Sequence, residues 1–365
     1  MKEKIRVAIV GVGNCASSLV QGIGFYRGKP NAAGLMHQDI GGYGPCDIEF
    51  VAAFDVAQGK VGKRLNEAIL SDLNCTTRFY PDELPDHPVV VQMGPVLDGV
   101  ADHMHEYHEG DVTYSVSDAE PCDVVNVLRT SGAEMLINYV PVGSEKAARF
   151  YAEACLEAGI GFINAMPTFI VSDQEWGRRF KARNVPAIGD DIKSQLGATI
   201  LHRVLTDLFE KRGIRLSRTY QVNFGGNSDF FNMLSRERLA SKKKSKTNAV
   251  QSQLKTPLPS DRVHISPSDF VPWLKDNKIC YIHMDGLGFG EVPLSIEIKL
   301  SVEDSPNSAG VAIDAIRCLK MASDRGIGGP LLSIAAYLMK SPPQQYSDSL
   351  AAQYVEEFIG GTRER

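Results

Sequence analysis

Residues 5–20, IRVAIVGVGNCASSLV, constrain the fold more than any other part of this chain. The β-branched run at residues 5–10 has the length of a strand buried on both faces, and a glycine turn separates it from a predicted helix. Gly11 permits the tight turn, and Gly13 lets the backbone approach a phosphate group. Ala16 takes the third small position, where helix and strand pack closely. The stretch predicts a dinucleotide-binding unit with the helix N-terminus facing the phosphates.

A second apolar run at residues 48–54 is followed by Asp55. An acidic side chain at the end of such a strand binds the adenosine ribose hydroxyls and favours NAD over NADP. Asp55 lies about twice as far from the glycines as the usual ~20 residues. The excess, residues 22–47, is rich in glycine, and we interpret it as an ordered insertion at the rim of the cofactor site. For the glycine turn at residues 11–13, an ordinary glycine-rich turn between strand and helix is the alternative interpretation.

The composition excludes several classes of protein. A length of 365 residues predicts two domains, with the 43% hydrophobic and 23% charged content of a soluble globular protein. The net charge of -5 gives no electrostatic case for nucleic acid, and no apolar run is long enough to span a membrane. The seven scattered cysteines form no C-x-x-C pair, and the first strand leaves no room for a signal peptide. We therefore expect a cytoplasmic protein without membrane or nucleic-acid partners.

Beyond Asp55, short apolar runs alternate with helical patterns at the spacing of a parallel, doubly wound sheet. Ligands of such sheets bind beyond the carboxyl ends of the strands, where Asp55 and the turns at residues 141–144 and 165–167 are expected. Ser144 suits the N-cap of the helix that follows. The predicted strands are residues 89–93, 135–139, 161–164 and 185–188, and the predicted helices are residues 61–70, 118–128, 145–158 and 176–183.

Two polar clusters stay open on spacing alone. The run GDDIKSQ at residues 189–195 suits a cation or phosphate site and, equally, the cap of a helix at residues 197–209. The histidines in HMHEYH, residues 103–108, do not share one helical face. A surface loop is therefore favoured over a metal site there.

The pattern changes past residue 215. Residues 220–224 and 293–302 alternate polar with apolar side chains, which is typical of an antiparallel sheet with one covered face. We therefore predict a dinucleotide-binding domain at residues 1–197, completed by residues 310–365, and a second domain at residues 198–309.

The most charged stretch, residues 236–247, contains Lys242 and Lys246 four residues apart, on one face of a helix. Neighbouring ammonium groups lower each other's pKa, so that one amine can act as a neutral base while the other stays charged. A solvated basic face is the simpler interpretation. A nucleic-acid patch is disfavoured because no aromatic side chains interleave the charges.

Lys278 and Lys340 lie beside turns, and Asp304 lies where an alternating strand meets a helix. The surrounding motifs resemble those of myo-inositol-1-phosphate synthases, most closely the short form of actinobacteria and archaea. The resemblance runs from residue 5 to about residue 360. The motifs are GVGNCASSL, YVPVGSE, GDDIKSQLGAT, NFGGNSDF, SKKKSKTNAV, EDSPNSAG, RGIGGP and AYLMKSPP.

The resemblance implies NAD as a catalytic cofactor and conversion of D-glucose 6-phosphate to 1D-myo-inositol 3-phosphate without net redox change. It implies an α/β fold, with a Rossmann-like doubly wound parallel sheet and an inserted α+β domain for catalysis and oligomerisation. It also implies a homotetramer, and a cation of unsettled identity near the NAD phosphates. A paralogous cyclase for another sugar phosphate, a plain NAD-dependent dehydrogenase and a non-catalytic regulator are the alternatives.

The resemblance also implies a set of site residues. The catalytic residues are Lys242, Lys246, Lys278, Lys340 and Asp304. The cofactor contacts are Gly11, Val12, Gly13, Asn14, Cys15, Asp55, Pro141, Val142, Ser144, Ala165, Met166, Asp191, Ser194, Asp304 and Ser305. The substrate contacts are Asn227, Ser228, Asp229, Lys242, Lys278 and Lys340.

Within this set we expect Lys242 to remove the C5 hydroxyl proton, with Asp304 as a relay. Lys246 and Lys278 are expected to stabilise oxyanions, and Lys340 to serve the aldol step or the phosphate.

Overall fold

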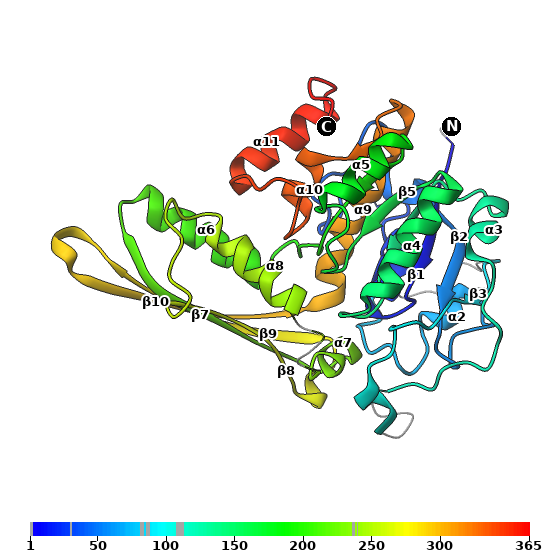
Figure 1. Cartoon of the computed structure of the whole chain (residues 1–365), viewed down its shortest axis with the longest axis horizontal. Coiled ribbons are helices and arrows are strands. Elements are labelled where there is room, and N and C mark those ends of the chain that lie inside the picture. Colours follow the sequence, from blue (N-terminus) through cyan, green and yellow to red (C-terminus); the bar gives the residue numbers. More distant parts are fainter. Residues whose placement is uncertain are drawn as a thin grey trace.

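The computed structural model describes residues 3–29, 31–80, 84, 88–106, 113–235, 238 and 240–365. The described chain contains a seven-stranded sheet and a four-stranded sheet, and the second extends as a long arm to one side of the first (Figure 1). The predicted fold class, a doubly wound parallel sheet with an added α+β unit, is confirmed.

All strand pairs in the first sheet are parallel, in the order β11-β6-β5-β4-β1-β2-β3. The chain runs to opposite sides from β1, which places a crevice at the carboxyl ends of β1 and β4. The strands are β1 (Ile5–Val10), β2 (Ile48–Asp55), β3 (Val91–Met93), β4 (Met135–Asn138), β5 (Gly161–Asn164), β6 (Pro186–Ile188) and β11 (Gly329–Pro330).

Helices cover both faces of this sheet. Val7 and Ile9 of β1 belong to a core with α1, α9, α10 and α11, whereas Ala8 and Val10 belong to a core with α3, α4 and α5. Strand β1 is therefore buried on both faces, as its unbroken apolar run predicts. The helices are α1 (Asn14–Phe25), α2 (Leu65–Ala68), α3 (Val124–Thr130), α4 (Glu145–Ala158), α5 (Gln174–Ala182), α9 (Asp304–Asp324), α10 (Leu332–Leu338) and α11 (Asp348–Ile359).

Two predicted helices are shorter than expected. The helix expected at residues 61–70 is the single turn α2. The helix expected from residue 118 begins only at Val124, because the Asp123 carboxylate caps it by accepting a hydrogen bond from the Asn126 N–H at 3.0 Å. An acidic cap therefore exists, but it is a later aspartate than the one predicted.

The second sheet has the order β10-β9-β7-β8. β10, β9 and β7 pair in antiparallel fashion, but β8 pairs parallel to β7, so the sheet is mixed and not antiparallel as expected. Helix α8 lies between β7 and β8 in the chain, and such a crossover returns the strand in the parallel direction. The elements are β7 (Arg215–Gly225), β8 (Val263–Phe270), β9 (Asn277–Leu287), β10 (Pro293–Glu303), α6 (Ala198–Lys211), α7 (Ser228–Asn232) and α8 (Ala240–Gln251).

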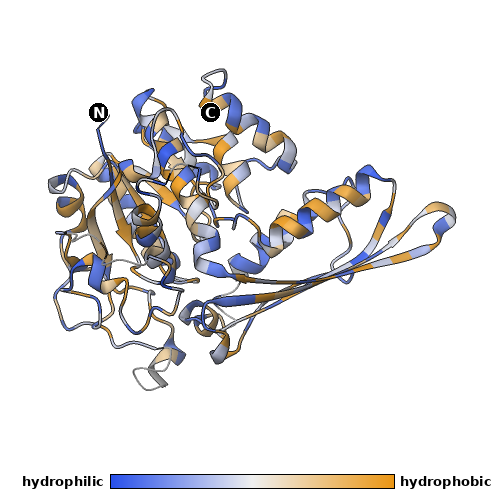
Figure 2. Cartoon of the chain, turned by 180° about the vertical axis from the view of Figure 1, so that it is seen from behind, coloured by the Kyte–Doolittle hydropathy of each residue, from blue (hydrophilic) through white to orange (hydrophobic). Residues whose placement is uncertain are grey.

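Only one face of the second sheet is covered. Cys280, Ile282 and Met284 of β9 are buried in a core with Phe209 of α6. Helices α6 and α8 lie along that face (Figure 1), and α6 shows hydrophobic and hydrophilic residues alternating around it (Figure 2). On the opposite face Tyr220 remains 42% exposed. The prediction of a sheet with one covered face is confirmed.

Helix α9 joins the two sheets, because it begins directly after β10 and packs against α1 of the first sheet. The chain then returns to the first sheet as β11, which pairs with β6. The short 3-10 helices are η1 (Pro45–Asp47), η2 (Asp102–Glu106), η4 (Pro272–Leu274) and η5 (Phe289–Glu291).

Candidate active site

A cavity of about 240 Å³ lies beyond the carboxyl ends of the first sheet, where the second sheet meets it. All the predicted catalytic and substrate residues line this cavity. The predicted cofactor residues line it too, apart from Val12 and Ser144. Gly13 and Lys242, which lie far apart in the sequence, therefore line the same cavity.

The glycine turn fits a dinucleotide. Gly11 has a positive φ of 84°, and a Cβ there would lie 2.4 Å from the Tyr139 carbonyl oxygen, so only glycine is accommodated. A Cβ added to Gly13 would meet nothing within 4 Å, which leaves open space above the start of α1. No side chain caps α1, so the N–H groups of its first turn are available to phosphate oxygens.

Asp55 lies at the end of β2, beside this turn, where the sequence predicts a contact to the ribose. Its carboxylate accepts a hydrogen bond from the Val12 N–H at 2.7 Å and thereby ties the turn to β2. The Val12 side chain is fully buried, so Val12 does not line the cavity. A carboxylate held by backbone donors keeps further lone pairs for ribose hydroxyls.

Ser144 lies at the N-cap of α4, as the sequence predicts, but it makes no side-chain capping bond. Asp98 caps the helix instead, because its carboxylate accepts hydrogen bonds from the N–H groups of Lys146 (2.8 Å) and Ala147 (2.9 Å). The Ser144 hydroxyl accepts a hydrogen bond from Arg238 at 3.0 Å, behind the cavity wall.

Four lysines reach the cavity from three places: Lys242 and Lys246 from α8, Lys278 from β9, and Lys340 from the segment after α10. Three of the four ammonium groups each pair with a carboxylate. The pairs are Lys278 with Asp304 (2.8 Å), Lys340 with Asp191 (2.7 Å) and Lys242 with Asp229 (3.1 Å).

Lys246 is the exception. Its amine has no hydrogen-bond or ion-pair partner in the part of the chain that the structure describes, and the residue is only 5% exposed. Burial, together with the positive charges of Lys242, Lys278 and Lys340, lowers the pKa of Lys246 well below that of an ordinary lysine. Both effects favour the neutral form of this amine.

The pair of Lys278 and Asp304 shows the opposite behaviour. Burial works against charge on both groups, but their mutual attraction outweighs it. The pKa of Lys278 is therefore raised and that of Asp304 lowered, so both stay charged near neutral pH.

Asp276 is a site residue that the sequence did not single out. It is 1% exposed, and its carboxylate accepts hydrogen bonds from the Asn227 side-chain amide (2.8 Å) and the Ser305 hydroxyl (2.9 Å). Its carbonyl oxygen accepts the Asp304 N–H at 2.9 Å. Burial raises the pKa of Asp276 to about 6. One side chain thus joins three turns of the site, and nothing in the local run KDNK distinguishes it.

Some residues of the run at 189–195 line the cavity, and others make hydrogen bonds away from it. Asp191 and Ser194 line the cavity. Asp190 is fully buried and accepts hydrogen bonds from Asn164 and Ser172, and burial raises its pKa to about 6. Lys193 points away and donates to the Ala336 carbonyl oxygen at 2.9 Å. The aspartates and the lysine therefore do not converge on one ligand.

The first turn of α6 offers a separate anion site. Gly197, Ala198 and Thr199 line the cavity, and no side chain caps the helix. The uncapped N–H groups and the positive helix end favour an anion at this position.

Two sequence features lie outside the site. No described residue of the insertion at residues 22–47 lines the cavity. The insertion packs against α9 instead, where Arg317 donates to the carbonyl oxygens of His37 (2.8 Å) and Tyr43 (3.2 Å). The His103 ring contacts the Phe231 carbonyl oxygen at 3.0 Å, whereas His108 lies outside the described residues. The described residues contain no cluster of metal-binding side chains.

Comparisons with known proteins agree with this geometry. The family model of myo-inositol-1-phosphate synthase matches residues 197–305. The inositol-3-phosphate synthase of Mycolicibacterium smegmatis is 53% identical over 98% of both chains. The crystal structure of Ari2 is 34% identical, with a TM-score of 0.78 over 99% of both chains. The inositol-3-phosphate synthase of Caenorhabditis elegans is 16% identical, with a TM-score of 0.77 over 98% of this chain and 86% of that one.

The fold and the site define a two-lobed enzyme in which a dinucleotide-binding sheet faces a lysine-lined cavity. With 53% identity over nearly its whole length, the chain belongs to the myo-inositol-1-phosphate synthase family. The family predicted from the sequence motifs is therefore confirmed.

Proposed function

We propose that this chain converts D-glucose 6-phosphate to 1D-myo-inositol 3-phosphate, with NAD as an internal oxidant and reductant. Family membership supplies the reaction. One observation carries its assignment to this cavity: a lysine amine with no ion-pair partner among the described residues, and with a pKa lowered by burial, faces the same space as the glycine turn. An amine of this kind is a base, and the chemistry needs a base beside the nicotinamide.

The residues at the glycine turn would hold the cofactor. Gly11 and Gly13 would admit the pyrophosphate, the first turn of α1 would donate N–H groups to it, and Asp55 would accept the ribose hydroxyls. When bound, NAD accepts a hydride from C5 of the sugar and later returns it.

Lys246 is the best candidate for the base that takes the C5 hydroxyl proton, because burial and the neighbouring ammonium groups lower its pKa and so favour the neutral amine. Lys242, whose amine lies 3.1 Å from the Asp229 carboxylate, is the alternative candidate. Asp304 keeps its proposed place as a proton relay, since its carboxylate is ionised and accessible from the cavity.

The charged lysines would stabilise the oxyanions. Oxidation at C5 acidifies C6, and the resulting enolate attacks the aldehyde at C1, so negative charge develops on oxygen twice. Fixed ammonium groups at Lys278 and Lys340 suit this task, because they are already oriented by Asp304 and Asp191. A cavity that holds the sugar folded also removes the entropy cost of bringing C6 to C1.

The phosphate of the substrate would bind at the uncapped first turn of α6. Thr199 and Ser194 line the cavity there, and the helix end adds a favourable potential for a dianion. Asn227, Ser228 and Asp229 remain the proposed contacts to the sugar hydroxyls.

We also propose a cation near the NAD phosphates, as the family implies. Oxygen ligands next to the glycine turn are offered by Ser305 and Ser308, whose hydroxyls each lie 3.9 Å from the Cys15 sulfur. Hard cations prefer such oxygen ligands. Activity of the chelator-treated enzyme with single added cations would identify it.

A homotetramer is proposed through the uncovered face of the second sheet. Tyr220 and Tyr281 are 42% and 41% exposed there, and the Tyr220 ring stacks on His283 at 5.1 Å. An aromatic sheet face of this kind is typical of a subunit interface.

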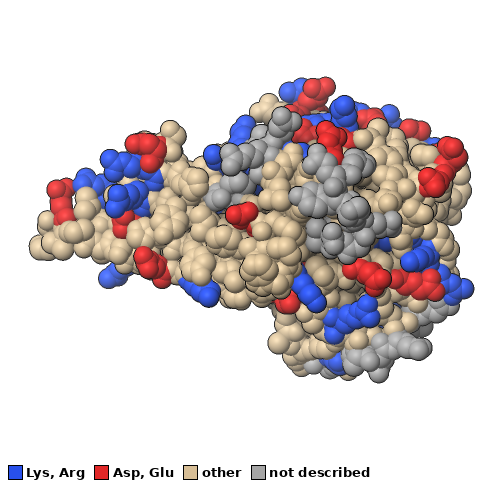
Figure 3. Space-filling view, turned by 90° about the horizontal axis from the view of Figure 1, so that it is seen from below, with Lys and Arg blue, Asp and Glu red and all other residues tan. Residues whose placement is uncertain are grey.

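Cytoplasmic location is also proposed. All seven cysteines are free thiols, which suits a reducing compartment. None of the described helices has both the length and the apolar character needed to cross a bilayer. Among the residues coloured by charge in Figure 3, acidic and basic side chains occur on the same face.

The test is the purified chain with D-glucose 6-phosphate and a trace of NAD, followed by phosphorus and carbon NMR. We expect inositol phosphate to accumulate far beyond the amount of NAD, while NADH stays substoichiometric. NADH rising in step with substrate loss would indicate a plain dehydrogenase. Turnover of a different hexose phosphate, with D-glucose 6-phosphate left intact, would indicate a paralogous cyclase.

A further inference from the structure

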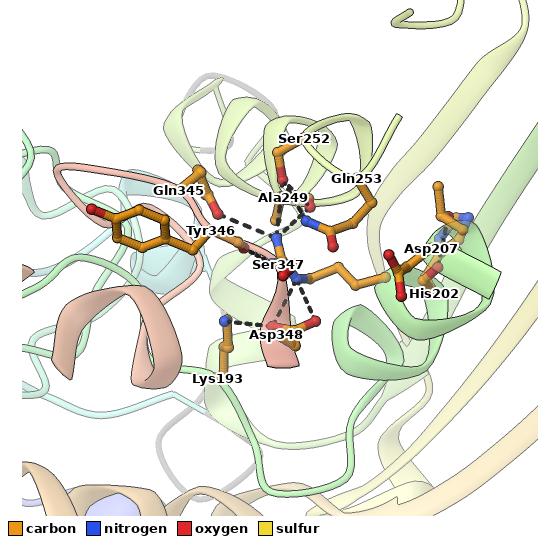
Figure 4. A network of polar contacts seen from close by, with 12 residues as sticks. Lys193, His202, Asp207, Ala249, Ser252, Gln253, Gln345, Tyr346, Ser347 and Asp348 are labelled. Carbon is orange, nitrogen blue, oxygen red and sulfur yellow. Dashed lines mark hydrogen bonds and ion pairs between the residues drawn. The ribbon is translucent and has the colours of Figure 1, made fainter. Parts of the chain in front are cut away.

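Ala249, Tyr346 and Asp348 lie close together in Figure 4, and all three accept hydrogen bonds from Arg203. Arg203 itself does not line the cavity. It belongs to α6, whose first turn faces the cavity, and it is 0% exposed. Burying a guanidinium group carries a large desolvation free energy unless its N–H groups donate to acceptors in the protein. Its acceptors therefore show what it holds together.

On one side Arg203 holds the end of α8. Its Nη1 donates to the Ala249 carbonyl oxygen at 2.6 Å and to the Ser252 hydroxyl at 3.1 Å. Ala249 lies three residues after Lys246, in the same helix. The position of Lys246 along and around the helix axis is thus tied to this guanidinium.

On the other side Arg203 holds the chain that follows Lys340. Its Nη2 donates to the Tyr346 carbonyl oxygen at 2.9 Å, and its Nη1 donates to the Gln345 side-chain oxygen at 3.2 Å. The Gln345 amide in turn donates to the Lys340 carbonyl oxygen at 2.7 Å. A continuous chain of hydrogen bonds therefore runs from α8 through Arg203 to the backbone of Lys340.

The charge of Arg203 is balanced by Asp348, which its Nε contacts at 3.0 Å. Asp348 also pairs with the buried Lys193 at 3.3 Å. Burial works against charge on Asp348, but Lys193 and Arg203 outweigh it, so its pKa is lowered and it stays ionised. The junction is a closed set of two cations on one carboxylate, separate from the ion pairs that line the cavity.

We propose that Arg203 is a positioning residue that fixes α8 against the Lys340 segment and thereby sets the spacing of the catalytic amines. On the cavity side, Asp191 accepts the Ser245 hydroxyl at 2.6 Å and pairs with Lys340, so the two elements are held at both ends. Without Arg203 the tie between α8 and the Lys340 segment would depend on the contacts at the cavity end alone, and the two elements could shift relative to each other. Guanidinium suits the role because its planar fork donates in two directions at once, which an ammonium group on a single stem cannot match.

The test uses Arg203→Lys, which keeps the charge opposite Asp348 but loses the fork. The direct readout is the pH at which the rate of acylation of Lys246 reaches half of its maximum. A competitive labelling experiment followed by mass spectrometry measures this rate. We expect this pH to rise toward that of an ordinary lysine, because the other amines move away. We also expect kcat to fall about tenfold to a hundredfold, the effect of a small misplacement, with the KM for NAD within about twofold.

Arg317→Lys is the matched control. Arg317 is also 0% exposed and donates to backbone carbonyl oxygens, but its partners lie in the segment at residues 37–43 and in α9. This variant should lose a similar amount of thermal stability while the labelling curve of Lys246 stays unchanged. An unchanged curve in Arg203→Lys, or an equal shift in Arg317→Lys, would overturn the proposal.

Gln345→Met keeps the buried charges and cuts only the link to Lys340, so it decides the question if Arg203→Lys fails to fold. A smaller shift of the same sign is expected, and no shift would contradict the proposal. The kinetic readout rests on the proposed function, but the labelling of Lys246 does not. Failure of the proposed function would appear as a parent enzyme that forms no inositol phosphate.

Discussion

The Lys278 ammonium group lies 2.8 Å from the Asp304 carboxylate, although one residue belongs to β9 and the other begins α9. The pair therefore joins the second sheet to the helix that packs on the first. Because each charge stabilises the other, Lys278 is unsuited to act as a neutral base near neutral pH, in keeping with our proposal of Lys246 for that role.

Replacing Lys246 tests the base directly. We expect Lys246→Met to lower kcat about a hundredfold to ten-thousandfold, the usual contribution of a general base. Lys246→Arg should be equally inactive, because guanidinium does not give up its proton in proteins. Single-turnover kinetics with a tritium-labelled C5 position would locate the loss in the oxidation step.

Lys243→Met is the control for this pair, since Lys243 is exposed on the same helix. It should retain the rate of the parent, and all three variants should bind NAD as the parent does. Substantial activity in Lys246→Arg would show that the base is another group.

The pH dependence of kcat/KM follows from the same lysines. Only the neutral form of Lys246 accepts a proton, so the rate should rise with pH through its lowered pKa and then level off. A decline at high pH should come late, because the raised pKa of Lys278 keeps its charge beyond the range of an ordinary lysine. A rate that falls on going from pH 6 to pH 8 would contradict this assignment.

Asp276 should make stability depend on pH. Its folded-state pKa of about 6 exceeds its ordinary value of 3.8, so the folded state binds more protons between these values. Its contribution to stability is therefore full below about pH 4 and is lost as the pH rises through about 6. Asp276→Asn abolishes this loss.

Urea unfolding of both proteins at pH 4 and pH 8 measures the effect. The free energy of unfolding of Asp276→Asn, relative to that of the parent, should be about 2–3 kcal/mol larger at pH 8 than at pH 4, so that the variant gains relative stability as the pH rises. Asp276→Ala should be less stable than the parent at both, because Asn227 and Ser305 lose their acceptor. A constant difference between Asp276→Asn and the parent would show that Asp276 ionises normally.

The proposed tetramer depends on the uncovered sheet face. Tyr281→Glu would place a charge in the centre of that face, so we expect the mass measured by light scattering to fall below that of four chains. Phe150→Glu, on α4 and 37% exposed, is the control and should leave the mass unchanged. A tetramer that persists in Tyr281→Glu would show that the interface lies elsewhere on the protein.

Features set by neighbours in sequence were predictable. The strand, glycine turn and helix at residues 5–20 depend on periodicity and on the space at Gly11 and Gly13, and both can be seen locally. The alternation at residues 293–302 likewise predicted a half-covered strand, which is β10. The lysine set and the family followed from whole motifs and their order along the chain.

Other features depend on residues that meet only in the folded chain. The sequence could show that Lys242 and Lys246 share a helix face, but not that Asp229 pairs with the first and leaves the second alone. The parallel course of β8, the buried Asp276 and the guanidinium of Arg203 were also decided by tertiary structure. The physical reason is that a pKa or a buried charge is set by the groups around it, and these come from distant parts of the sequence.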